Sequence, residues 1–191
     1  MMKKSLLLLA ALVLGGCATH WPESALLNPQ VIPSNQQYYS GNRITMEGVD
    51  NREAAYVFSI KKKEKAPVLV NSSQPLNNLL AEKLAEGLRS QGLEVGNSGT
   101  TNLTLAITTA AVTVEEKTFT YVTKSRVSLQ VIADFQGSKL TKQFNMSSSK
   151  EGPGEPSMAD LESTLNQQLG SVLQQIMADE ALRGYLKGQP S

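Results

Sequence analysis

Residues 119–135 read Phe-Thr-Tyr-Val-Thr-Lys-Ser-Arg-Val-Ser-Leu-Gln-Val-Ile-Ala-Asp-Phe. Apolar residues occupy most of the odd positions, whereas Lys124, Arg126, Ser128 and Gln130 occupy even ones. An alternation with a period of two predicts a β-strand that has one buried and one solvated face. The same parity holds over about 17 residues, which is long for a single strand, so we expect a bend near residues 123–125.

The neighbouring segments extend this pattern into a three-strand meander. A turn at Glu115–Lys117 precedes the central stretch, and Gln136–Ser138 has the composition of a tight hairpin turn. Arg43–Gly48 alternates in the same way, and two short strands are expected within residues 56–70. The apolar positions of the outer two meander strands are Leu103, Leu105, Ile107, Leu140, Phe144 and Met146.

Two segments carry apolar residues at helical spacing. The first follows Pro75, which suits the first helical position, and it ends before Gly92; we expect Ser72 or Ser73 to cap it. The second follows Ser157, and Asp160 stands three residues later, as in a capping box. Residues 179–187 predict a short terminal helix. The two apolar stripes contain Leu76, Leu79, Leu80, Leu84 and Leu88, and Met158, Leu161, Leu165, Leu169, Val172, Leu173, Ile176 and Met177.

These elements predict an α+β fold. We expect a two-layer sandwich, in which a mixed, mostly antiparallel sheet carries the two main helices packed on one face. The opposite face of the sheet would then be solvated.

The N-terminus has the features of an export signal. Lys3 and Lys4 precede an apolar run, Ser5–Leu14, that is too short to span a membrane. The tetrad Leu14–Cys17 ends in the single cysteine of the chain and resembles the lipobox of bacterial lipoproteins. We therefore expect residues 1–16 to be a signal peptide that is removed, and Cys17 to be lipidated. Palmitate labelling of Cys17 would follow.

Residues 17–42 lack periodicity and contain three prolines. We expect this segment to be a lipidated flexible tether, followed by a single α+β periplasmic domain over residues 43–191. Trp21, Leu26 and Leu27 within the tether have two possible positions, on the membrane or on the domain.

Composition excludes several classes of function. The 18 basic and 17 acidic side chains are nearly balanced, which argues against a nucleic-acid partner. The single histidine, His20, lies in the tether, and one histidine with a lipidated cysteine cannot supply a catalytic triad or a zinc site. We therefore expect no enzyme activity, no cofactor and no metal.

Asp50 and Arg52 form one polar cluster at the end of a predicted strand. They are our candidate for a patch that contacts a partner, although a turn held by local hydrogen bonds explains the same residues. The run Lys61–Lys65 has two interpretations as well, a solvated loop or a contact with anionic lipid or glycan.

The chain as a whole resembles the YajG-like uncharacterised lipoproteins of Gram-negative bacteria. The resemblance rests on collinear features: Leu14–Cys17, Gly48–Arg52, the helix around Leu79–Arg89 leading into Gly92, Asn102-Leu103, and Lys124–Ile132. It implies a lipid-anchored envelope protein and supplies no catalytic residue. Lipoproteins retained in the inner membrane carry aspartate after the cysteine; Ala18 therefore implies the outer membrane, with the domain facing the periplasm.

These features predict a lipid-anchored periplasmic binding or adaptor module of the cell envelope. Its partners would be the membrane, through the N-terminal lipid, and another envelope protein. An alternative is a carrier or sensor of a lipid or other apolar ligand held between the helices and the sheet. A hydrolase with an unrecognised site is the third hypothesis. The oligomeric state is left open.

Overall fold

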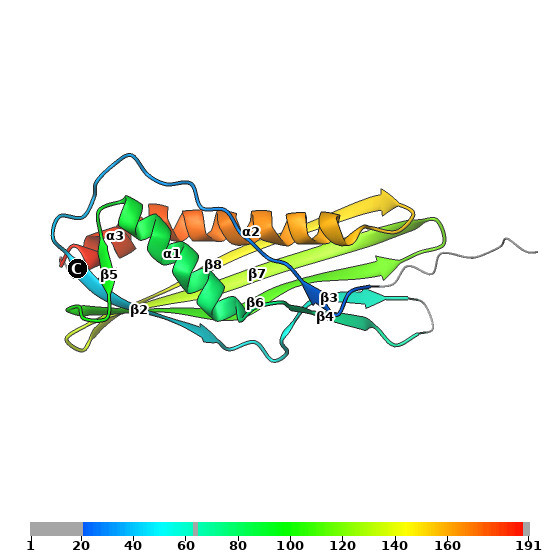
Figure 1. The fold of residues 1–191 in the computed structure, drawn as a ribbon, viewed down its shortest axis with the longest axis horizontal. Helices are drawn as coiled ribbons and strands as arrows, with labels where there is room; N and C mark the ends of the chain where they lie inside the picture. The colour runs from blue at the N-terminus through cyan, green and yellow to red at the C-terminus, as the bar shows by residue number, and fades with distance from the viewer. Residues whose placement is uncertain (1–20, 63–64, 189–191) are drawn as a thin grey trace, which may run out of the picture.

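Three long antiparallel strands form one half of the sheet in the computed structural model, which describes residues 21–62 and 65–188 (Figure 1). They are β6 (Thr101–Glu116), β7 (Thr120–Phe135) and β8 (Ser138–Pro153). The predicted turn at Gln136-Gly137 is confirmed. Both residues have positive φ, 52° and 89°, as a two-residue hairpin turn requires.

The expected bend at residues 123–125 is wrong, because β7 runs without interruption and keeps one parity. The irregularity lies instead in β6, where the register with β7 shifts between Ile107 and Thr109. A β-bulge of this kind inserts one extra residue and moves later side chains to the opposite parity. Buried side chains accordingly change from odd to even positions along β6: Leu103, Leu105 and Ile107, then Ala110, Val112 and Val114.

The other edge of β6 pairs with two strands in succession. β2 (Arg43–Asp50) runs parallel to the first half of β6, and β3 (Tyr56–Lys61) runs parallel to the second half. Short strands complete the sheet: β4 (Val68–Ser72) pairs antiparallel with β3, β1 (Ser24–Ala25) pairs parallel with β4, and β5 (Glu94–Gly96) pairs parallel with β2.

The helices are α1 (Leu76–Ser90), α2 (Met158–Ala178) and α3 (Glu180–Leu186). The capping box at the start of α2 is confirmed, since Ser157 and Asp160 exchange hydrogen bonds. The serine cap expected for α1 is wrong, because Pro75 takes the capping position and no side chain caps this helix. α1 packs on β2 and α2 packs on β7 and β8, so that both stripes of leucines enter one core.

The predicted fold class is wrong. Among the described residues, 43% lie in strands and 26% lie in helices, and the eight described strands form a curled half-barrel rather than one layer of a mostly antiparallel sandwich. Four of the described strand pairings are parallel and three are antiparallel. Strands twist cumulatively along their length, so three strands of 16 residues curl strongly.

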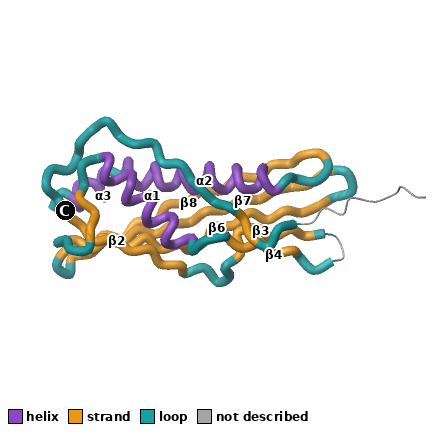
Figure 2. Tube along the Cα trace, viewed as in Figure 1, coloured by secondary structure: helices purple, strands orange, loops and turns teal. Residues whose placement is uncertain are grey.

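Residues 26–32 lie along α2 in extended conformation, where we expected a flexible tether (Figure 2). The backbone N–H groups of Leu26, Asn28 and Ile32 donate hydrogen bonds to side chains of α2, to Glu162 Oε1 at 2.8 Å, Asn166 Oδ1 at 2.8 Å and Gln174 Oε1 at 3.2 Å. We call residues 21–42 the strap.

The spacing of these hydrogen bonds has a geometric cause. Two residues of extended chain span about 6.6 Å, and four residues of α-helix rise about 6 Å. Every second strap residue therefore meets every fourth residue of α2. Gly170 is the α2 residue that lies opposite Gln30 in this spacing. It has no side chain because a Cβ atom there would lie under 3.0 Å from the carbonyl oxygen of Gln30. The tether prediction is thus wrong for residues 21–42, and residues 17–20 lie outside the described chain.

Candidate functional site

The sheet contains a gap where β6 changes partner. Asp50, the last residue of β2, pairs with Ile107, and the pairing with β3 begins only at Phe58 and Val112. No described strand pairs with Thr108–Ala111 on this edge. The β-bulge lies in the same four residues, so the backbone of β6 is both unpaired on one side and locally bent here.

Asp50 and Arg52 hold the chain that bridges this gap. Arg52 donates from Nε to Asp50 Oδ1 at 2.8 Å and from Nη2 to Asp50 Oδ2 at 2.7 Å, in a bidentate pair. Its Nη1 also donates to the carbonyl oxygen of Tyr56 at 3.2 Å. The guanidinium therefore ties the end of β2 to the start of β3.

The pair is only partly accessible. The Arg52 side chain is 7% exposed and that of Asp50 is 30% exposed. The Arg52 guanidinium hydrogen-bonds to the Asp50 carboxylate and holds the pKa of that carboxyl below its ordinary value of 3.8. The structure thus brings the two predicted residues together and gives them internal partners. Whether they also contact another protein stays a prediction.

A pocket of about 410 Å³ opens beside this pair. We call it the fork pocket; it is lined by Asn51, Arg52, Glu53, Ala54, Tyr56, Thr108, Thr109, Ala110 and Ala111. Asn51 and Glu53 are exposed, and they supply amide and carboxylate groups beside the free edge of β6. An unpaired strand edge offers backbone donors and acceptors in register, which is suited to binding an extended chain.

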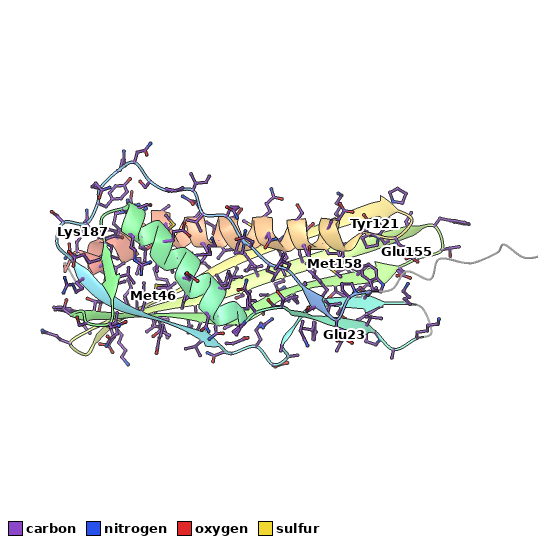
Figure 3. The ribbon with its side chains drawn as sticks, in the orientation of Figure 1. Glu23, Met46, Tyr121, Glu155, Met158 and Lys187 are labelled. Atoms are coloured by element: carbon purple, nitrogen blue, oxygen red, sulfur yellow. The ribbon has the colours of Figure 1, made fainter. Side chains whose placement is uncertain are left out.

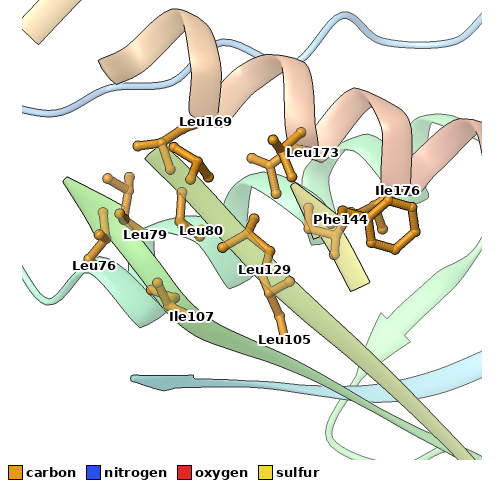
Figure 4. Close-up of a cluster of buried hydrophobic side chains, with 14 of the residues drawn as sticks. Leu76, Leu79, Leu80, Leu105, Ile107, Leu129, Phe144, Leu169, Leu173 and Ile176 are labelled. Atoms are coloured by element: carbon orange, nitrogen blue, oxygen red, sulfur yellow. The ribbon is translucent and has the colours of Figure 1, made fainter. Parts of the chain in front are cut away.

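The space between the helices and the sheet is filled by side chains. Leu80, Leu129 and Leu169 meet there and are fully buried (Figure 4). A second surface hollow of about 440 Å³ lies between the strap and α2, and its lining is rich in polar side chains such as Gln167 and Gln174. The interior of the described chain thus shows packed leucines at the place where the carrier hypothesis requires a ligand.

The remaining predicted residues have different outcomes. Cys17 and His20 lie outside the described residues. Within the basic run, Lys62 pairs with Glu116 at 3.1 Å and Glu155 at 3.6 Å, while Lys61 and Lys65 are exposed.

Over residues 21–62 and 65–188, no group of three or more His, Cys, Asp or Glu side chains is arranged to hold a metal ion. Among the same residues, no helix is long and apolar enough to cross a membrane.

Sequence reasoning missed the residues that form the gap. The signal was present, because the apolar positions of residues 103–114 change from odd to even after Ile107. We read only the first half of that segment and so did not predict the bulge at Thr108 and Thr109.

Sequence reasoning also missed Gln168, which lies in the apolar stripe of α2. It is buried and donates from Nε2 to Ser125 Oγ at 2.7 Å and Ser148 Oγ at 2.8 Å. This network lies on the inner face of the sheet and has a packing role.

Comparison with known proteins agrees with the sequence resemblance. The chain is 25% identical over 190 residues to the uncharacterized lipoprotein YajG of Escherichia coli strain K12, covering 98% of both chains. The crystal structure of protein XCC0632 from Xanthomonas campestris superposes with a TM-score of 0.63 at 10% identity, over 86% of this chain and 98% of that one, which shows a shared fold. A family model described as uncharacterized lipoprotein matches residues 29–187. The chain therefore belongs to this family of uncharacterized lipoproteins, together with YajG.

Proposed function

We propose that this lipoprotein is an adaptor of the cell envelope, which binds an extended segment of another envelope protein at the fork pocket. The lipid is attached at Cys17 after removal of residues 1–16, and the outer membrane holds the protein with its domain in the periplasm. The protein acts by binding rather than by catalysis.

The free edge of β6 at Thr108–Ala111 is the observation that carries this proposal. A partner strand that lies there would donate to and accept from backbone groups that have no strand partner in the described sheet. Arg52 joins Asp50 at the end of β2 to Tyr56 at the start of β3, so the chain that crosses the gap is held by hydrogen bonds of the fold. Native sheets usually cover or pair such an edge.

The packed interior supports adaptor binding over ligand carriage. The side chains of Leu80, Leu129 and Leu169 are 0% exposed. A ligand could enter the space that they fill only if the close-packed core opened. The fork pocket has both polar and apolar lining residues and lies at the surface, as expected for a site that recognises a peptide.

Site-specific photo-crosslinking in intact cells tests this function. A photoreactive amino acid at Glu53, an exposed residue of the pocket, should crosslink to an envelope protein. Combining it with Ala111→Lys, which places a long side chain in the pocket, should abolish the crosslink. The matched control is Thr141→Lys, which adds the same side chain at an exposed position of β8.

The two lysine variants distinguish binding at the fork pocket from a general effect of added surface charge on the crosslink. Loss of the crosslink with Ala111→Lys and its retention with Thr141→Lys would support the adaptor function. A crosslink that survives Ala111→Lys, or no crosslink from Glu53 at all, would contradict binding at the fork pocket.

A further inference from the structure

The strap fixes how far the folded body can lie from its lipid. Described structure begins at Trp21, which is buried, and Cys17 stands four residues earlier. An extended chain spans at most about 3.6 Å per residue, so roughly 14 Å separates Trp21 from the lipidated residue at the greatest reach. A flexible segment of 26 residues would allow a much larger distance between the folded body and Cys17. Because the strap is packed on the body, only the four residues before Trp21 can span that distance.

The register of the sheet identifies the end of the molecule that lies nearest the lipid. β1 runs parallel to β4, with Ser24 opposite Asn71, so the chain before Ser24 leads back toward the start of β4. β4 begins after the β3–β4 loop, and Lys61 at the end of β3 pairs with Glu115 near the end of β6. The β6–β7 turn therefore lies at the same end as Trp21.

The figures agree with this register. Figure 3 shows Glu23, Tyr121 and Glu155 in one half of the long axis, and Met46 and Lys187 in the other. Figure 1 shows the β6–β7 turn and the end of β3 at the first of these ends.

This end presents exposed apolar side chains. Phe119, at the tip of the β6–β7 turn, is 84% exposed, and Val68 and Leu69 at the start of β4 are exposed as well. The turn is held in place, because Lys117 N donates to Thr120 O at 2.8 Å and Gly154 N donates to Phe119 O at 2.9 Å. A phenyl ring that is exposed to water leaves apolar area unburied, and the same ring would bury that area at a lipid interface.

Basic side chains flank the same apolar residues. Lys61, the last residue of β3, and Lys65, within the β3–β4 loop, are both exposed. Aromatic and basic residues together are typical of surfaces that contact the headgroup region of a membrane, where the ring enters the boundary and the ammonium groups attract anionic lipids.

We infer that this end of the molecule is a membrane-contacting surface, in which Phe119 enters the lipid interface and Lys61 and Lys65 lie over the headgroups. The inference rests on lipidation of Cys17, which is part of the proposed function. It determines the orientation of the body: the β7–β8 turn and α3 form the end remote from the membrane.

Quenching by membrane-bound nitroxides tests the orientation. The mature lipidated protein, with Phe119→Cys carrying a fluorophore, would be reconstituted in vesicles of phosphatidylethanolamine and phosphatidylglycerol that contain a headgroup-region nitroxide lipid. The matched control is Thr141→Cys, an exposed position near the start of β8, at the end of the molecule remote from Phe119. Lipid blocks the thiol of Cys17, so each variant carries a single reactive thiol.

We expect the fluorophore at position 119 to be quenched roughly two- to threefold more than that at position 141, because interfacial side chains enter about 5–10 Å into the headgroup boundary. Equal quenching, in protein that floats with the vesicles, would overturn the orientation while leaving the lipid anchor intact. Protein that fails to float would overturn the anchor and the orientation together. Unchanged urea midpoints in both variants would show that the fold is retained.

Discussion

At the scale of single residues, the structure gives Asp50, Arg52 and Gly170 defined partners. Asp50 and Arg52 share a bidentate ion pair beside the gap in the sheet, and Arg52 also joins β2 to β3. Gly170 gives the strap room to cross α2. Both assignments predict measurable changes in the free energy of unfolding.

Asp50→Asn should lower the free energy of unfolding by about 1 kcal/mol at neutral pH. Hydrogen bonds to charged groups contribute more than this when buried, but partial exposure of Asp50 reduces the contribution. The pKa of Asp50 is lowered in the folded protein, so its contribution is present above the ordinary value of 3.8 and is lost as the pH falls through the lowered folded value. Urea unfolding of both proteins from pH 7 to pH 3 should show the difference shrink at the acid end. A constant difference would contradict the ion-pair role.

Gly170→Ala should destabilise the protein by about 1–3 kcal/mol, because the added methyl must displace backbone of the strap. Gly184→Ala in α3 is the matched control, since its Cβ would meet nothing within 4 Å. Removing a helical glycine should make that variant neutral or more stable by up to about 1 kcal/mol. Thermal unfolding of the two variants compares them directly; equal shifts would mean that the strap does not lie on Gly170.

At the scale of elements, the strap is the largest difference between expectation and structure. Its proline-rich composition is typical of linkers, but its N–H groups find acceptors on α2 that are spaced four residues apart. The side chains of neighbouring strap residues therefore have unequal environments. Leu27 is 0% exposed and Leu26 is 70% exposed.

Leu27→Ala should cost about 2–5 kcal/mol, as expected for a fully buried leucine. Leu26→Ala, the adjacent residue with the same change, should fall within about 0.5 kcal/mol of the wild type. Urea denaturation of the mature protein measures both. Wild-type stability for Leu27→Ala would show that this part of the strap does not join the core.

The sequence predicted those elements that depend on local patterns. β7 follows from its alternation, α2 from its apolar stripe and its Ser157–Asp160 box, and the β7–β8 turn from Gln136-Gly137. It did not predict the parallel pairing of β2 and β3 with a single strand, because alternation identifies a buried face and carries no information about which strand lies beside it. The strap was missed for the same reason: its partners lie about 140 residues away in the sequence, as the separations of 136, 138 and 142 show.

At the scale of the whole molecule, the strap lies between the proposed lipid anchor at Cys17 and the proposed binding site. It is part of the folded body, it leaves few residues between the body and Cys17, and it returns the chain to β2, whose end borders the fork pocket. With Cys17 lipidated and the body oriented as proposed, the pocket would lie at a defined side and height above the membrane. Residues 21–42 therefore belong to the folded domain.

Residue-resolved amide hydrogen exchange of the mature protein measures whether the strap is folded onto α2. The amides of Leu26, Asn28 and Ile32 donate to α2, so they should exchange far more slowly than an unstructured chain, at rates set by local opening of the strap. We expect slow exchange at all three positions. Exchange at the unstructured rate at these positions, with α2 still protected, would show a flexible tether and contradict this expectation.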